Sequence, residues 1–155
     1  MFIIIIMVQL PKQDGRDGEG IHLVLYDGVC GLCSRFLRFA IRHDRRCVFR
    51  FASLQSAVGK TIVARMGGNP EDLTSFYVFA NFRAPRGRVL TRSNAALFVA
   101  GELGWPWKAL RLAGLLPAVL LDRAYDVIAR LRYRLFRRHD QCETPPPGFR
   151  SRFID

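Results

Sequence analysis

Apolar residues along this chain recur with two different periods, and the change from one to the other predicts where strands and helices lie. The branched apolar run at residues 21–26 is typical of a buried strand. Residues 34–43 have helical periodicity with arginines opposite the apolar side chains, which predicts an amphipathic helix with a basic outer face. Residues 47–52 alternate like a second strand, and residues 53–66 are helical up to a Gly-Gly-Asn-Pro stop. The face of the first helix that we expect to be buried carries Leu32, Phe36, Phe39, Ala40 and His43.

The middle of the chain predicts a hairpin followed by a helix. Residues 74–80 and 88–91 form two strands around a Pro-Arg-Gly turn, so they should pair in antiparallel fashion. Ser93 is a good N-cap residue for a helix over 94–103, which ends at Gly104. The first two strands are joined through a helix and should therefore be parallel. The order β-α-β-α-β-β-α is that of the thioredoxin fold, and it predicts an α/β protein with a thioredoxin-like core.

A helical extension should follow this core. Trp105 and Trp107 are expected to cap the core. The apolar residues 107–121, interrupted by Pro117, either pack onto the sheet, which we favour, or form a membrane-surface patch. Residues 122–138 then predict a long, arginine-rich helix. One face of this helix carries Asp122, Tyr125, Ala129, Tyr133 and Phe136.

We expect a single domain built from three parts. Residues 1–20 hold an apolar run and a polar linker, residues 21–104 form the core, and residues 105–155 form the helical extension and tail packed on the core. The tail from residue 141 is expected to be extended, because it contains three consecutive prolines. The apolar run at 2–8 is far shorter than the roughly 20 residues that span a bilayer as a helix. It is consistent with an extra strand, a membrane contact or upstream sequence.

The composition is that of a globular protein, with half of the residues apolar and a mean hydropathy of +0.07. The net charge of +11 is spread along the chain without a compact basic tract, which argues against a nucleic-acid-binding protein. Four cysteines do not make a disulfide scaffold at this length. No secretory signal is evident, so we expect a cytoplasmic location, with peripheral contact at the membrane left open.

The chemistry is expected at Cys30-Gly31-Leu32-Cys33, where the first strand turns into the first helix. Two thiols three residues apart can close a disulfide, and the free N–H groups of a helix start favour a thiolate on the first sulfur. This arrangement indicates thiol–disulfide chemistry. Asp27 precedes the first cysteine by three residues, and either serves as general base for the second thiol or is the turn residue of an Asp-Gly pair.

Further motifs accompany the cysteines. They are Tyr26-Asp27-Gly28-Val29 before Cys30, Phe36 and Phe39, Arg42-His43-Asp44-Arg45-Arg46, Phe51-Ala52-Ser53-Leu54-Gln55-Ser56, Ser93-Asn94-Ala95, Asp122-Arg123-Ala124-Tyr125, Ile128-Ala129, Arg132-Tyr133, Phe136 and Cys142. With these motifs the sequence resembles the DCC family of thiol–disulfide oxidoreductases, which are thioredoxin-like proteins named for an Asp-x-x-Cys-x-x-Cys signature. Three positions depart from the family pattern, which commonly has Gly at Arg92, Asn at Leu131 and Gly at Arg137.

The resemblance implies a thiol–disulfide oxidoreductase whose catalytic residues are Cys30, Cys33 and Asp27. Cys30 would attack, as the more exposed sulfur, and Cys33 would resolve the mixed disulfide. The partners would be a protein or small-molecule thiol or disulfide and an external electron donor or acceptor, with no cofactor and no metal. The cis-proline that thioredoxins place before the third strand has no counterpart here, and the backbone of Thr74 and Ser75 is expected to take its place.

The alternative is a non-catalytic binding module, either at an anionic membrane surface or stabilised by zinc. A CxxC is half of a zinc site, and Cys47 and Cys142 would have to complete it. Neither has a partner at CxxC spacing, so we favour the redox interpretation. Cys47 is expected to be a small buried residue. Cys142 is expected to be inert, unless the tail folds over the CxxC and makes it a third redox thiol.

Overall fold

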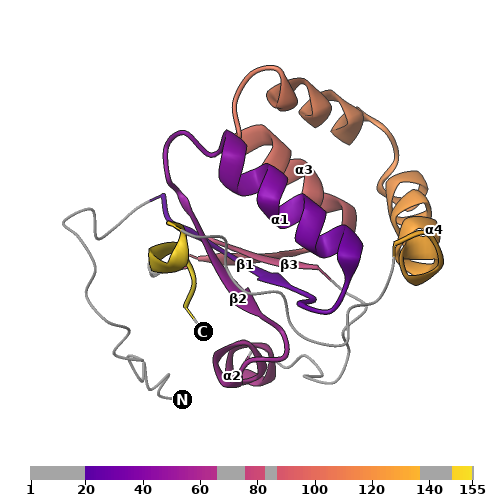
Figure 1. Cartoon of the computed structure of the whole chain (residues 1–155). Helices are drawn as coiled ribbons and strands as arrows, with labels where there is room; N and C mark the ends of the chain where they lie inside the picture. Colours follow the sequence, from indigo (N-terminus) through magenta and orange to yellow (C-terminus); the bar gives the residue numbers. More distant parts are fainter. Residues whose placement is uncertain (1–19, 66–75, 83–86, 137–147, 155) are drawn as a thin grey trace, which may run out of the picture.

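The computed structural model describes residues 20–65, 76–82, 87–136 and 148–154. Its centre is a four-stranded sheet in the order β2-β1-β3-β4 (Figure 1). The strands are β1 (His22–Tyr26), β2 (Phe49–Ser53), β3 (Tyr77–Ala80) and β4 (Arg88–Thr91). β1 pairs with β2 in parallel, whereas β3 is antiparallel to both β1 and β4. The predicted parallel pair and the predicted hairpin are both confirmed.

The helices complete the predicted order β-α-β-α-β-β-α and add the extension. They are α1 (Gly31–His43), α2 (Ala57–Arg65), α3 (Arg92–Glu102), the 3-10 helix η1 (Trp107–Leu115), α4 (Ala118–Leu135) and the 3-10 helix η2 (Arg150–Arg152). α1 and α3 cover one face of the sheet, and α2 lies on the other (Figure 1). The α/β fold class predicted from the sequence is therefore confirmed.

Alternation along β1 divides the core between the two faces of the sheet. Val24 and Tyr26 belong to the cluster that packs against α1 and α3. Leu23 and Leu25 belong to the smaller cluster on the α2 side, together with Val63 of that helix. Because both faces of β1 are covered, its residues 23–26 are apolar or aromatic on both sides.

The buried face of α1 is rotated from the predicted one. Its buried residues are Gly31, Ser34, Leu37, Ala40 and Ile41. The small side chains among these let the helix approach the sheet closely. The larger rings of Phe36 and Phe39 are only partly buried at the edges of this face, where they pack edge-on against Phe76 and Trp107. The predicted basic outer face is present, since Arg38 and Arg42 are exposed.

Two helix starts differ from the prediction. α2 begins only at Ala57, because Ser53 to Ser56 form a turn in which the Ser56 hydroxyl accepts the amide hydrogen of Gly59. α3 begins at Arg92 with Thr91 as its N-cap residue, so the predicted N-cap role of Ser93 is wrong. The Ser93 hydroxyl is buried and donates a hydrogen bond to the carboxylate of Asp122 in α4.

Arg92 has a φ of 53°, in the left-handed region that favours glycine. This is one of the positions at which the sequence departs from the family that it resembles. The Arg92 guanidinium lies 3.8 Å from the carboxylate of Asp126 across the gap between α3 and α4. The departure therefore places a long side chain on a strained backbone position.

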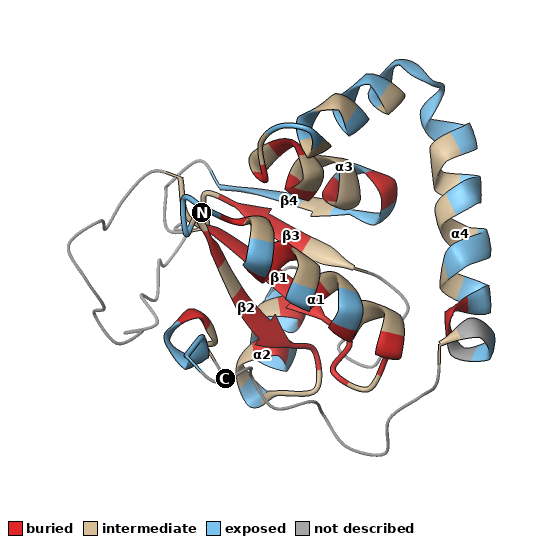
Figure 2. Ribbon diagram, turned by 45° about the horizontal axis from the view of Figure 1, so that its top comes forward, coloured by how far each residue is buried: buried red, intermediate tan, exposed pale blue. Residues whose placement is uncertain are grey.

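Residues 107–121 do not pack onto the sheet as expected, because η1 lies mainly against α3. Within η1, Trp107 packs against the core cluster, edge-on against Phe39 and His43. Trp105 is 82% exposed, so the prediction that it caps the core is wrong. Leu112 and Leu115 are also largely exposed, and the exposed residues follow η1 into α4 around the edge of the molecule (Figure 2).

The end of the chain returns to the sheet. Phe153 forms a parallel bridge with Phe51 of β2, and the Ile154 amide donates a hydrogen bond to the Phe51 carbonyl. Arg152 is buried and forms an ion pair with Asp44 at 2.7 Å. The described part of the tail thus includes the helical turn η2 and a sheet contact, and is not simply extended, whereas residues 141–147 lie outside the described part of the chain.

Candidate functional site

The two cysteines of the CxxC lie at the junction between the end of β1 and the start of α1. Cys30 has an extended backbone and is the N-cap residue, and its carbonyl accepts the amide hydrogen of Ser34 as the first helical bond. Cys33 follows one turn into the helix and approaches Cys30 to 3.5 Å. The fold therefore brings both thiols to the N-terminus of α1, as the sequence predicts.

The environment of Cys30 favours its thiolate. The Cys33 thiol donates a hydrogen bond to it, and this contact is the largest cause that lowers the pKa of Cys30 to about 6. The amide groups of Leu32 and Cys33 and the positive charge of Arg132 lower the pKa further, while burial opposes them. A thiol with this pKa is mostly ionised at neutral pH and can act as a nucleophile.

The environment of Cys33 favours its protonated form. The hydrogen bond that it gives to Cys30 raises its pKa strongly, and burial and the neighbouring Cys30 charge act in the same direction. When the pair carries a single proton, that proton stays on Cys33 and Cys30 is the thiolate. The expectation that Cys30 is the more exposed residue is wrong. Cys30 has no exposed surface, whereas Cys33 is half-buried, because Cys30 sits at the junction of strand and helix and not on the helix surface.

Asp27 is fully buried at the end of β1 and serves as the turn residue. Its Oδ1 accepts the Val29 amide hydrogen at 3.1 Å, as in an Asx turn. The same oxygen accepts a hydrogen bond from Nε2 of Gln55 at 2.7 Å. Its charge is close enough to Cys33 to raise the pKa of that thiol.

Gln55 links the CxxC turn to the end of β2. Its Oε1 accepts hydrogen bonds from the Gly28 amide at 2.9 Å and from the Ser53 hydroxyl at 2.6 Å. Its amide group is therefore held on both sides, with the nitrogen on Asp27 and the oxygen on the turn backbone. The network fixes the turn that carries Cys30.

Arg132 of α4 is the residue that sequence reasoning missed. Its Nη2 lies 3.5 Å from Oδ2 of Asp27, and both side chains are buried. The Arg132 charge lowers the pKa of Cys30. It also partly offsets the increase in the pKa of Cys33. Helical spacing offered a signal, because position 132 follows Tyr125 by seven residues on the same face. The periodicity predicts Tyr133 on this face, and the side chain of Tyr133 lies outside the described residues.

A second residue of α4 reaches the site from the same face. The Tyr125 hydroxyl accepts the amide hydrogen of Phe76 at 3.1 Å, just before β3. Burial is the largest cause that raises the pKa of Tyr125. Thr74 and Ser75, which we expected to replace the thioredoxin cis-proline, lie outside the described residues. The amide of the next residue, Phe76, is occupied by Tyr125.

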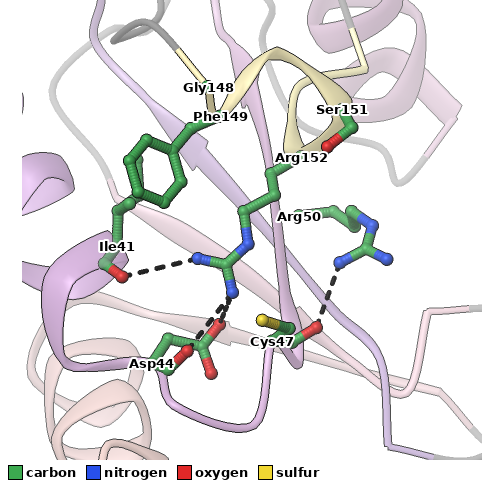
Figure 3. A pocket seen from close by; sticks show the side chains of 8 residues that line it. All are labelled: Ile41, Asp44, Cys47, Arg50, Gly148, Phe149, Ser151 and Arg152. Atoms are coloured by element: carbon green, nitrogen blue, oxygen red, sulfur yellow. Dashed lines mark hydrogen bonds and ion pairs between the residues drawn. The ribbon is translucent and has the colours of Figure 1, made fainter.

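Cys47 lies far from this site. It follows the C-terminal end of α1, a helix whose 13 residues span about 20 Å. It is exposed, contrary to expectation, and lies in the loop before β2 with a φ of 53°. Its thiol lines a pocket of about 380 Å³ together with Asp44 and Arg152 (Figure 3).

A zinc site through Cys47 therefore has no support from the geometry. Within the described part of the chain, His, Cys, Asp and Glu side chains form no group of three that could hold a metal ion. Cys142, the other predicted zinc ligand, lies outside the described residues. The helices of the described segments include none that is both long and apolar enough to cross a membrane.

Comparisons with known proteins agree with the geometry of the dithiol site. Residues 24–138 match the family model described as DCC1-like thiol-disulfide oxidoreductase. The chain is 34% identical over 133 residues to the uncharacterized protein YuxK of Bacillus subtilis, covering 86% of this chain and 93% of that protein. It is also 34% identical over 122 residues to the chloroplastic DCC family protein At1g52590 of Arabidopsis thaliana, covering 78% of this chain and 68% of that protein. No solved structure matches the chain. The family supports a redox role, and the match spans the CxxC, Asp27, Gln55 and Arg132. The chain belongs to the DCC1-like thiol-disulfide oxidoreductase family.

Proposed function

We propose that the protein catalyses dithiol–disulfide exchange through Cys30 and Cys33. The observation that carries the proposal is the approach of Cys33 to within 3.5 Å of Cys30 at the start of α1. At this distance the Cys33 thiol lowers the pKa of Cys30 to about 6. A cysteine pair in which one sulfur is ionised and the other holds the proton is prepared for two successive attacks.

In the first step the Cys30 thiolate attacks one sulfur of a substrate disulfide. A bond forms between Cys30 and that sulfur, the substrate disulfide bond breaks, and the other substrate sulfur leaves as a thiolate. Because Cys30 is buried, the side chains around it must open before a protein disulfide can reach it.

The second step uses Cys33. Once Cys30 is in a mixed disulfide it carries no charge, so the largest cause of the high Cys33 pKa disappears. Cys33 then loses its proton, attacks Cys30 and releases the second substrate thiolate. Asp27, whose charge is felt at Cys33, is our candidate acceptor for this proton, with Arg132 stabilising the anions. The substrate gains two electrons, the Cys30–Cys33 pair becomes a disulfide, and an external thiol reductant restores the dithiol.

Trapping of the mixed disulfide tests this assignment. Cys33→Ser should accumulate a covalent adduct with a small aromatic disulfide such as dithionitrobenzoate at Cys30, identified by mass spectrometry of the peptides. Cys30→Ser should form no such adduct at Cys33 and should lose disulfide reductase activity. Cys47→Ser is the matched control, since it removes an exposed thiol and should leave turnover unchanged. Full reductase activity in Cys30→Ser would overturn the proposal.

A further inference from the structure

The outer surface of η1 and α4 is apolar where a folded chain is usually polar. At the corner between the two helices, Leu112, Leu115 and Val119 are exposed by 67%, 85% and 66%. Figure 2 shows this corner projecting at the edge of the molecule, away from the sheet. A continuous exposed surface of large aliphatic side chains marks a contact site for something outside the fold.

The apolar surface continues along α4 as a stripe, which we define as Leu120, Val127 and Leu131. Their spacing of seven and four residues places them on one face, and they are 55%, 55% and 36% exposed. The opposite face of α4 is fixed on the core by Tyr125 and Arg132. The apolar stripe therefore points away from the core because the polar contacts of the helix point toward it.

A row of arginines runs beside the apolar stripe. Arg123, Arg130 and Arg134 each follow a stripe residue by three positions, so they form a parallel row one step around the helix. All three are exposed. The outer face of α4 thus carries hydrocarbon along one line and positive charge along the next.

We propose that this face binds the surface of an anionic lipid bilayer. An amphipathic helix lies in the bilayer interface with its apolar side chains among the acyl chains and its arginines at the anionic headgroups. The net charge of +11 argues against a second copy of the chain as the occupant, because two such copies repel each other. A fluid bilayer also accommodates the uneven row of Leu112, Leu115 and Val119 at the corner without a matching protein surface.

Co-sedimentation of the full-length protein with vesicles tests the proposal. Binding is expected to vesicles of phosphatidylcholine mixed with phosphatidylglycerol, to be weak with phosphatidylcholine alone, and to fall as salt is added. The Cys30→Ser/Cys33→Ser double variant should bind as the parent does, so failure of the proposed redox function leaves this result unaffected.

Two sets of substitutions locate the contact. Leu120→Gln/Val127→Gln/Leu131→Gln should weaken vesicle binding about tenfold or more, because it removes aliphatic side chains that would enter the bilayer. Val89→Gln, at an exposed apolar position of β4, is its control and should have no effect. Arg123→Gln/Arg130→Gln/Arg134→Gln should weaken binding about 10- to 100-fold. Its control, Arg42→Gln/Arg45→Gln/Arg65→Gln, removes the same charge from exposed positions elsewhere and should have a much smaller effect.

Three outcomes would overturn the proposal. Equal losses in the two arginine triple variants would mean that net charge alone attracts the vesicles. Undiminished binding of the folded Leu120→Gln/Val127→Gln/Leu131→Gln variant, the apolar triple variant, would assign the contact elsewhere, for example to the apolar run at residues 2–8. Absence of vesicle binding, with self-association that the apolar triple variant abolishes, would assign the face to a second copy of the chain. Circular dichroism of each variant shows whether it remains folded.

Discussion

The Arg132 guanidinium of α4 lies 3.5 Å from the Asp27 carboxylate at the end of β1, and both side chains are buried. This pair joins the last long helix to the turn that carries the CxxC. A buried pair of this kind costs much when one partner is lost, because the other charge remains without compensation. The same guanidinium lowers the pKa of Cys30, so the pair connects folding stability with thiol chemistry.

Removal of the Arg132 charge should therefore have two effects. Arg132→Gln is expected to destabilise the protein by about 3–5 kcal/mol in urea unfolding. It should also raise the Cys30 pKa, measured from the ultraviolet absorbance of the thiolate as a function of pH. Arg132→Lys keeps the charge, should remain more stable and should shift the pKa less. The exposed neighbour Arg134→Gln is the control, and an equal pKa shift there would contradict a specific role of the buried pair.

The reactivity of Cys30 should follow a pKa of about 6. Its rate of reaction with a small disulfide should rise about tenfold per pH unit below this value and level off above it, because only the thiolate attacks. Cys33→Ala removes the hydrogen bond that is the main cause of the lowered pKa, so the profile should move to higher pH. The pH profiles are measured as single-turnover rates, in a Cys47→Ser background that lacks this exposed thiol. An unshifted profile in Cys33→Ala would show that the hydrogen bond does not set the pKa.

The same shift predicts how the Cys30 contribution to stability varies with pH. The folded-state pKa of Cys30 is below its ordinary value of 9.0. Between these two values the unfolded chain binds more protons at this position, so the contribution of Cys30 to stability increases with pH. Comparison of the urea unfolding free energies of the reduced parent and Cys30→Ser across this window isolates the effect. A difference that stays constant with pH would contradict the lowered pKa.

Tyr125 should hold α4 against β3. Tyr125→Phe removes the acceptor of the Phe76 amide and is expected to destabilise the protein by about 1–3 kcal/mol, because a partly buried donor loses its partner. A looser α4 should also expose Cys30, so alkylation of this buried thiol should accelerate relative to that of Cys47. Peptide mass spectrometry during a pulse of iodoacetamide measures both rates. Tyr77→Phe, on the neighbouring strand residue, is the control and should change neither stability nor alkylation to the same extent.

Arg92→Gly should stabilise the protein by about 1 kcal/mol, since glycine adopts the left-handed backbone without the steric cost that arginine carries there. The ion pair with Asp126 that is lost is partly exposed and contributes little. Urea unfolding provides the comparison. Arg88→Gly, in the ordinary backbone of β4, should instead destabilise the protein, and the opposite pattern would argue against strain at Arg92.

Local patterns in the chain suffice to predict the order of the elements and the position of the thiols. Strands and helices of the core follow from periodicity, because β1 is apolar on both sides and α1 repeats at helical spacing. The Cys30 and Cys33 pair is predicted at a helix start because the Asp-Gly turn ends the strand pattern and the helical pattern begins after it. These are local properties of the chain, and neighbouring residues suffice to predict them.

The surroundings of the thiols depend on how distant segments of the chain pack together. Asp27 and Arg132 are separated by more than a hundred positions in the chain, and their ion pair depends on how α4 packs against the end of β1. The burial of Cys30 and the exposure of Leu115 likewise appear only once the segments are packed. Periodicity shows that a helix has an apolar face but does not show which other element covers it, because packing between distant segments is absent from any local pattern.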